Sequence, residues 1–454
     1  MSAGVFPNTH SCRCEEGAAS NFAHHLPVEM DSTQATFVEE RIIPDNGLVG
    51  GRSFDFTIDP SPDSFLVLNN LVLDFKFMVT KDDNKVLDDT DAVVMTPLIL
   101  STMFQSIECR LNDQLINPES SQNIPYKSFI ESILSYDAHG QGQLEARGSM
   151  KGGLVGMHTV ERYRDANGKE KTRMVIAQHW RMGLIREGKE VQASGPLCVD
   201  FLRVNNHLAP GNKLSLRLTR AEDGIIFRVG RLSKNTNYKA TITDMGLSLR
   251  WIQLLPSLTR TLLQNKAPEK YFGAHVVMKN FGVSPDLMQW IQPLVEQGNV
   301  LPKHIVVTMK STQNYLGQRK DDTMSFKHFD VGHVALRRGN RSIPSKPLTP
   351  NFEEHRYARE YFRLFEQTGK AHGSFWHDLT PGYFRGSFPF FVWDMSPDLC
   401  NGGAHTHIGK LEEMQLELKF RKPIPEPITI LVMMSFDQVI SVDRSTREVH
   451  RQQF

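Results

Sequence analysis

The sequence lacks a surplus of charge of either sign. Its 454 residues include 52 lysines and arginines against 51 aspartates and glutamates, which leaves a formal net charge of +1. Proteins that coat nucleic acid or anionic membranes carry a clear excess of basic residues. The balance therefore excludes binding through bulk charge as the main activity of the chain.

Long hydrophobic runs and a cysteine framework are also missing. No stretch approaches the roughly 18 consecutive apolar residues that cross a bilayer, and the start, MSAGVFPNTH, has no basic region followed by an apolar core. The five cysteines are scattered and odd in number, which fits a reducing compartment better than a disulfide framework. We therefore expect a soluble intracellular protein without a membrane-spanning segment.

Signatures of common enzyme and metal sites are weak or missing. Cys12 and Cys14 could form a zinc site only with partners such as His24 and His25 at an uncommon spacing, so we favour incidental thiols. The sequence contains no GxGxxG, GxxxxGK[ST], GxSxG or HExxH motif. Nucleotide-binding, serine-hydrolase and zinc-protease activities therefore have no local support.

The strongest signature of chemistry is the pair His405 and His407, followed by Glu412. Two imidazoles at positions i and i+2 of a strand share one face, and a carboxylate could complete a site for iron or manganese. The arrangement resembles the first metal motif of cupins. A cupin also needs a later histidine behind a Pro-x-Gly turn, whereas only His450 lies downstream and no such turn follows. We therefore expect no catalytic residues, cofactor or metal, and keep these three residues as weak metal candidates.

What the sequence does contain is a β-rich composition in a long chain. A single core stops growing beyond about 250–300 residues, so a chain of this length predicts two domains. The 27 phenylalanines, 24 prolines and 32 glycines favour many short strands separated by turns.

Alternating apolar residues predict strands in both halves of the chain. In Ser53–Asp59, for example, Phe54, Phe56 and Ile58 share one face before Pro60 ends the pattern. The other expected strands are Leu71–Val79, Phe104–Leu111, Leu197–Val204, Leu214–Leu218, Met245–Trp251, Ile305–Met309, Phe329–Leu336, Met414–Phe420 and Ile428–Phe436.

A polar stretch from Asp137 to Gly195 interrupts the strands of the first half. It is rich in charge and contains the turn-forming residues from Asp165 to Gly168. We expect long surface loops at one end of the first domain. An insertion after Asn167 should therefore be tolerated.

The two halves repeat one order of elements. In each half a strand and a turn precede one amphipathic helix, expected within Ile124–Gly140 and His355–Gly373, and a late strand pair follows. The matched residues are Phe104 with Phe329, Leu111 with Leu336, Tyr126 with Tyr357, and Lys213–Leu218 with Gln415–Phe420. We interpret the repeat as two tandem eight-stranded jelly rolls, an all-β double jelly roll in which each roll has a short inserted helix.

This interpretation divides the chain into five parts. We predict a flexible N-terminal arm at 1–33, jelly roll 1 at 34–255, a linker of helical character at 256–270, jelly roll 2 at 271–442 and a C-terminal tail at 443–454. The tail carries Arg444, Arg447 and Arg451, which could touch DNA phosphates. We favour a solvated tail over one that contacts DNA.

Several motifs resemble a known family. They are SFIESILSYDAHGQGQ, LPKHIVVTM, SKPLTPNFEEHRYAREYFRLFEQTGK, GGAHTHIGKLEEMQLELKF and SFDQVISVDR, and they keep their order from about Thr36 to Arg444. Together they resemble the major capsid proteins of adintoviruses and of the virus-like Polinton (Maverick) transposons. The resemblance implies a non-enzymatic protein with a double jelly-roll fold, and no catalytic residue carries over.

The resemblance also implies an assembly. Such a protein forms homotrimeric, pseudo-hexameric capsomers that build an icosahedral shell around double-stranded DNA. Its expected partners are copies of itself, a vertex (penton) capsid protein and packaged DNA on the inner face. Its expected location is the virion capsid, assembled in the nucleus or cytoplasm of a host cell. Two alternatives stay open: a bicupin-like metal-dependent enzyme, which metal analysis would detect, and a domesticated, transposon-derived β-sandwich that binds carbohydrate or protein, which would not assemble.

Overall fold

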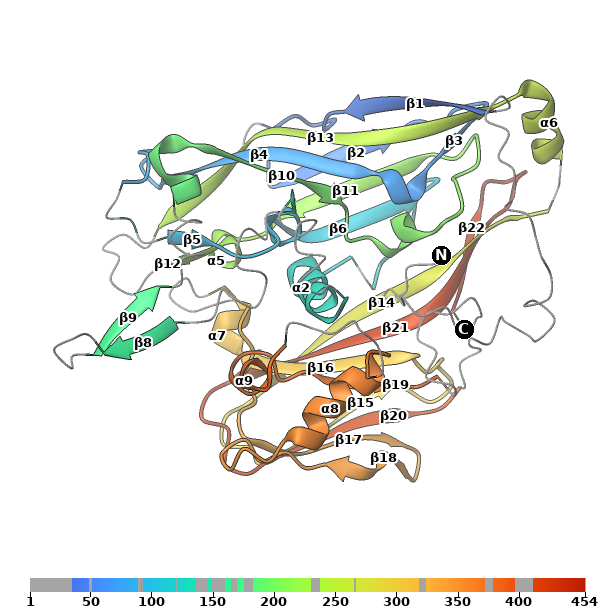
Figure 1. The fold of residues 1–454 in the computed structure, drawn as a ribbon. Coiled ribbons are helices and arrows are strands. Elements are labelled where there is room, and N and C mark those ends of the chain that lie inside the picture. The colour runs from blue at the N-terminus through green and yellow to red at the C-terminus, as the bar shows by residue number, and fades with distance from the viewer. Residues whose placement is uncertain are drawn as a thin grey trace, which may run out of the picture.

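The computed structural model describes residues 35–48, 51–88, 91, 93–119, 121–135, 146–147, 160–164, 170–174, 183–229, 237–264, 267–317, 324–371, 379–396 and 411–453. They form two stacked pairs of antiparallel sheets, with helix α2 (Ile124–Ser135) between the pairs (Figure 1). We call the first pair of sheets together with α2 roll 1, and the second pair roll 2. The expected arm at 1–33, with its cysteines and histidines, lies outside the described residues.

The outer sheet of roll 1 has five antiparallel strands. Their order is β1-β13-β4-β10, with β3 paired to β13. On β4, Leu73, Phe75 and Phe77 are buried, whereas the residues between them are half-buried. This alternation is typical of a sheet with one face toward a core. The strands are β1 (Ala35–Ile42), β3 (Ser64–Leu66), β4 (Val72–Lys81), β10 (Glu190–Pro196) and β13 (Tyr238–Leu254).

A four-stranded sheet closes the core of roll 1 from the other side. Its order is β2-β11-β6-β7. The ring of Phe104 on β6 meets the ring of Phe75 on β4 edge to face, at 5.7 Å between centroids, so the two sheets share one aromatic core. The strands are β2 (Ser53–Ile58), β6 (Phe104–Leu111), β7 (Gln114–Leu115) and β11 (Leu214–Arg220).

Roll 2 repeats this arrangement. Its five-stranded sheet has the order β14-β21-β16-β19 with β22 paired to β21, and its four-stranded sheet has the order β15-β20-β17-β18. The strands are β14 (Glu269–Val283), β15 (Gln289–Val295), β16 (His304–Ser311), β17 (Val331–Arg338), β18 (Arg341–Leu348), β19 (Phe391–Asp394), β20 (Met414–Phe420), β21 (Ile428–Val442) and β22 (Val449–Gln453).

Strand register confirms the alignment of the two halves. In roll 1 Leu214 of β11 lies opposite Leu111 of β6, and in roll 2 Leu416 of β20 lies opposite Leu336 of β17. Leu214 and Leu416 are matched residues of the sequence repeat, and so are Leu111 and Leu336. Pairing across the sheets therefore reproduces the match along the chain.

The helices are few, and the two longest of roll 1 and roll 2 follow matching strands. Helix α2 comes after β7, and α8 (Ala358–Gln367) comes after β18, where amphipathic helices were expected. Helix α6 (Pro256–Gln264) lies in the expected linker, at one end of the molecule (Figure 1). The described part of the chain contains no helix long and apolar enough to cross a membrane.

The remaining elements are short. They are α1 (Ile99–Thr102), α5 (Asp223–Ile226), α7 (Thr312–Tyr315), α9 (Pro381–Gly386), the 3-10 helices η2 (Leu68–Asn70), η5 (Arg186–Gly188) and η6 (Asp200–Arg203), and the two-stranded pairs β5 (Val93–Met95) with β12 (Phe227–Val229) and β8 (Val160–Arg164) with β9 (Glu170–Met174).

Three sequence predictions were wrong in detail. The strand expected at Leu197–Val204 is instead η6, because its charged residues turn toward partners on α2. The polar stretch does not end as a loop: β10 pairs with β4 and buries Val191 and Ala193, too few apolar residues to stand out in the sequence. The expected C-terminal tail contains β22, which extends the sheet beside β21.

Candidate functional site at the junction of the rolls

Helix α2 belongs to roll 1 by sequence but is covered by roll 2. All its residues except Ser135 are buried. The Tyr126 ring stacks on Tyr315 with 5.2 Å between centroids, and its hydroxyl donates to the Tyr315 carbonyl oxygen at 2.8 Å. The Phe129 ring packs beside Phe326 and Phe388 of roll 2. The helix is therefore shared between the two cores.

Four charged side chains lie beside this apolar contact. Lys127 and Glu131 come from α2, while Asp200 and Arg203 come from η6. The Lys127 Nζ atom is 2.6 Å from Asp200 Oδ1, and an Arg203 nitrogen is 2.8 Å from Glu131 Oε2. With two positive and two negative groups, this junction cluster is balanced, as buried charges must be.

Neighbouring charges favour the ionised forms of Lys127 and Asp200 in this cluster. Burial alone would lower the pKa of Lys127, but the carboxylates of Asp200 and Glu131 outweigh it and raise that pKa. Burial would likewise raise the pKa of Asp200, and the positive charges of Lys127 and Arg203 outweigh it and lower that pKa. Each ion therefore depends on its partners, and removing one partner leaves a buried charge uncompensated.

One bond joins the cluster directly to roll 2. The second oxygen of Asp200, Oδ2, accepts a hydrogen bond from the backbone nitrogen of Val276 on β14 at 2.9 Å. Next to it, buried His275 places Nε2 3.4 Å from Glu119 Oε2, and Glu119 also contacts Arg451 of β22 at 3.2 Å. Charged contacts therefore run from α2 through η6 to two strands of roll 2, and they fix how the rolls sit together.

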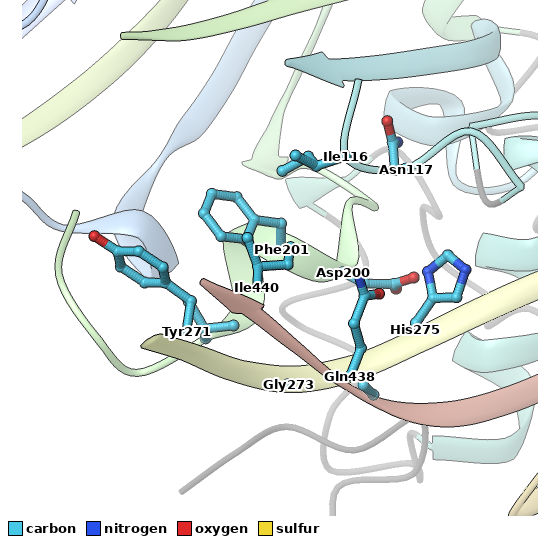
Figure 2. A pocket seen from close by; sticks show the side chains of 11 residues that line it. Ile116, Asn117, Asp200, Phe201, Tyr271, Gly273, His275, Gln438 and Ile440 are labelled. Atoms are coloured by element: carbon cyan, nitrogen blue, oxygen red, sulfur yellow. The ribbon is translucent and has the colours of Figure 1, made fainter. Parts of the chain in front are cut away.

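A small cavity adjoins the cluster. Figure 2 shows Asp200, Phe201, Tyr271, His275 and Gln438 around it, contributed by both rolls. Its volume of about 20 Å³ is the space of one water molecule. Gln438 Nε2 has no hydrogen-bond partner among the described residues, whereas His275 Nε2 lies beside Glu119. The cavity is too small for a metabolite, so the junction is a structural site rather than an active site.

The predicted metal candidates are not brought together in the described structure. His405 and His407 lie outside the described residues. Glu412 forms a two-point contact with Arg338, in which Arg338 Nη2 donates to Glu412 Oε1 at 2.9 Å. No cluster of three or more metal-ligating side chains occurs within the described ranges. The absence of a metal at His405 and His407 stays a prediction.

Sequence reasoning missed the junction cluster. One signal was present: Lys127 and Glu131 interrupt the apolar pattern of the predicted helix at i and i+4 spacing, where they share a face. Their partners could not be found in the same way, because Asp200 and Arg203 lie about 70 positions away in a segment expected to be a strand.

Comparisons with known proteins bear on the fold. No family model matches the chain. A Caenorhabditis elegans protein described only as uncharacterised is 19% identical over 413 residues, which cover 86% of this chain and 91% of that protein.

Solved structures resemble the chain over nearly its whole length. A structure of the Sputnik virophage matches with a TM-score of 0.55 and 10% identity, covering 95% of this chain and 90% of that one. The capsid of the virus PBCV-1 gives 0.54 and 10%, covering 95% and 99%, and the Faustovirus major capsid protein gives 0.53 and 8%, covering 94% and 95%. The predicted fold, an all-β double jelly roll, is thereby confirmed.

Proposed function

We propose that the chain is a major capsid protein that forms homotrimers and tiles a closed shell, without catalytic activity. The observation that carries this proposal is a difference between the two five-stranded sheets. On β16 every residue is buried, and β21 is buried continuously from Ile428 to Gln438. On the matching strands β4 and β13 of roll 1, buried residues alternate with exposed or half-buried ones.

The difference arises because roll 1 covers one face of the five-stranded sheet of roll 2, the face that points away from the core of roll 2. Lys310 of β16 places Nζ 4.4 Å from the centre of the Tyr126 ring on α2, so the even-numbered residues of β16 face roll 1. In the part of the chain that the structure describes, nothing covers the corresponding face of roll 1 in this way. There Arg41 bridges Asp74 and Asp244 on an accessible, polar sheet surface.

A second copy supplies the missing cover. If roll 2 of one chain covers the open sheet of roll 1 in the next, as roll 1 covers roll 2 within a chain, the contact is head to tail. Six rolls from three chains then close a ring of nearly six-fold outline. Such a ring packs in a hexagonal net, which is the geometry of a shell.

The similar solved structures support the same proposal. Two of them are described as a virus capsid and a major capsid protein. We extend the proposal to a capsid of the Polinton or adintovirus type on the sequence motifs, with a virion location, an icosahedral shell around double-stranded DNA, and a vertex protein as partner. We also propose two domains joined through α6: residues 34–255, and residues 271–442 together with β22, which pairs with β21.

Solution mass tests the trimer. Three chains of 51.6 kDa give 3 × 51.6 = 154.8 kDa, and light scattering after size exclusion should show this mass or larger assemblies. Thr241→Arg places a bulky charge on the exposed outer face of β13 and should release monomers. Thr57→Arg, on the outer face of the four-stranded sheet of the same roll, should leave the trimer intact. A clean wild-type monomer at micromolar concentration would contradict the proposal.

A further inference from the structure

A hollow of about 630 Å³ opens on roll 2, and it shares no lining residue with the small cavity at the junction of the rolls. Three loops and α9 form it, and α9 lies at the end of roll 2 away from α6 (Figure 1). The loops are the turn before β17, the turn before α8 and the turn before β21. Pockets of roughly 300–1,000 Å³ that combine aromatic walls with a few polar groups are typical of small-ligand sites.

The backbone around this loop hollow is strained at two places. Phe329 and Asp330 have φ values of 43° and 52°, and His355 has 56°. Left-handed backbone is unfavourable for residues with a side chain, and it concentrates at binding sites where the surroundings enforce it. The strain turns the Phe329 ring and the His355 imidazole toward the same hollow, since both residues line it.

The charges of the loop hollow favour an anion. Arg385 of α9 lies with Nη1 3.0 Å from His355 Nε2, and within the described chain it pairs with no carboxylate. Lys327 is 3.2 Å from Glu426, which balances it. Arg385 therefore has no carboxylate in salt-bridge contact among the described residues, and its planar fork suits two parallel hydrogen bonds to a carboxylate or sulfate.

The rings of His328, Phe329 and Tyr357 line the rest of the wall, and Phe352 lies buried behind them. The His328 ring stacks on Phe352 at 4.1 Å between centroids, and Phe352 stacks on Tyr357 at 5.4 Å. Phe329 adds a half-buried ring. Stacked aromatic faces present a flat apolar surface, and the polar edges beside them accept and donate hydrogen bonds to hydroxyl groups.

We propose that the loop hollow binds an acidic saccharide, with Arg385 holding its carboxylate or sulfate and a sugar ring lying against Phe329. A polynucleotide fits less well, because its backbone needs a continuous track of cations, and of the cations described in this hollow Lys327 is already paired with Glu426. The site would give the shell protein a binding activity beyond assembly.

Titration of the full-length protein tests the site. Sialyllactose carries a carboxylate, a heparin-derived disaccharide carries sulfates, and lactose carries neither, so comparing them identifies the anion. We expect one of the two acidic sugars to bind measurably and lactose to bind at least about tenfold more weakly, since a charge-assisted hydrogen bond contributes at least that factor.

Arg385→Gln should weaken binding about tenfold or more. Arg359→Gln is the matched control, because Arg359 lies on α8 outside the hollow and donates to backbone oxygens of Lys346 and Pro347. His355→Asn tests the positioning of Arg385 without loss of fold, because asparagine tolerates left-handed backbone. Unchanged thermal midpoints show that the variants fold.

Three results would overturn the proposal. One is that neither acidic sugar binds at millimolar concentration. Another is that Arg359→Gln weakens binding as much as Arg385→Gln. The third is that an oligothymidylate binds the loop hollow and displaces the sugar, which would assign it to nucleic acid.

Discussion

Helices α2 and α8 follow matching strands in the two rolls, yet their surroundings differ. When Tyr126 is aligned with Tyr357, Lys127 matches Ala358 and Glu131 matches Phe362. The two charged residues of α2 are buried in the junction cluster, whereas the Phe362 side chain of α8 is 54% exposed. The two matched positions are therefore buried and charged on α2, whereas on α8 one of them is exposed and carries an aromatic ring.

This reversal teaches that burial along a repeated helix depends on what packs against it. On α2 the segment η6 covers the face that carries Lys127 and Glu131, where Asp200 pairs with Lys127 and Arg203 pairs with Glu131. On α8 Arg359 reaches back to the carbonyl oxygens of Lys346 and Pro347, and Tyr361 donates to the Leu379 carbonyl oxygen. The buried residues of α8 are Leu364, Glu360 and Gln367, and the two polar ones accept hydrogen bonds from the backbone nitrogens of Thr349 and Asp394.

The largest expected loss of stability comes from placing a charge at matching core positions of the two rolls. Leu216 and Leu418 occupy matching inward positions of β11 and β20, and both are fully buried. Leu216→Asp and Leu418→Asp should each cost several kcal/mol, because a buried carboxylate has no partner there, against a typical domain stability of about 5–15 kcal/mol. The yield of soluble trimer measures the loss.

Ser215→Asp is the control, since Ser215 is half-buried on the outward face of β11. It should fold like the parent protein. If Leu216→Asp were tolerated while Leu418→Asp abolished folding, the two rolls would not depend on equivalent cores, and the comparison would fail.

An intermediate loss of stability is expected from removing the buried cation of α2, for which α8 has no equivalent. Lys127→Met leaves Asp200 and Glu131 facing Arg203 alone, and breaking such a buried pair costs about 3–5 kcal/mol. Arg359→Met removes an exposed cation of α8 next to Ala358, the residue that matches Lys127, and should cost no more than about 1 kcal/mol. Urea unfolding of both variants measures the difference.

Adding Asp200→Asn to Lys127→Met should recover part of the loss, because the second change removes the uncompensated carboxylate. Equal, small losses for Lys127→Met and Arg359→Met would show that the junction cluster does not hold the rolls together.

The fold was largely predictable because its signals are local and repeated. Alternation of Phe54, Phe56 and Ile58 is enough to identify β2, and the match of Leu214 with Leu416 is enough to relate the two sheets. The predicted strands at Phe104–Leu111 and Met414–Phe420 have the observed bounds.

The predictions for β10 and η6 were wrong because these elements depend on contacts between residues far apart in the sequence. β10 is a short strand with polar outward residues, and only its pairing with β4 makes it a strand. η6 resembles a strand in its apolar content, but Asp200 must reach both Lys127 and Val276, and that requirement sets its backbone. The junction cluster consists of such long-range partners, so periodicity could not reveal it.

The smallest expected effect concerns the exposed end of the junction, where Glu119 meets His275 and Arg451. The hydrogen bond from His275 lowers the pKa of Glu119 from 4.5 to about 2. A carboxylate with a lowered folded-state pKa contributes stability that is present above its unfolded pKa of 4.5 and is lost as the pH falls toward 2. The Glu119 side chain is 48% exposed, so solvent screening limits this contribution to about 1 kcal/mol or less.

Glu119→Gln should therefore flatten the fall of the unfolding free energy between pH 4.5 and pH 2, and it should slightly lower the unfolding free energy at neutral pH. Glu190→Gln is the control, because Glu190 lies at an exposed position of β10, and it should leave the whole pH profile unchanged. Guanidinium unfolding at a series of pH values measures the profile, and an acid limb that is identical in the parent and in Glu119→Gln would show that this contact does not stabilise the junction.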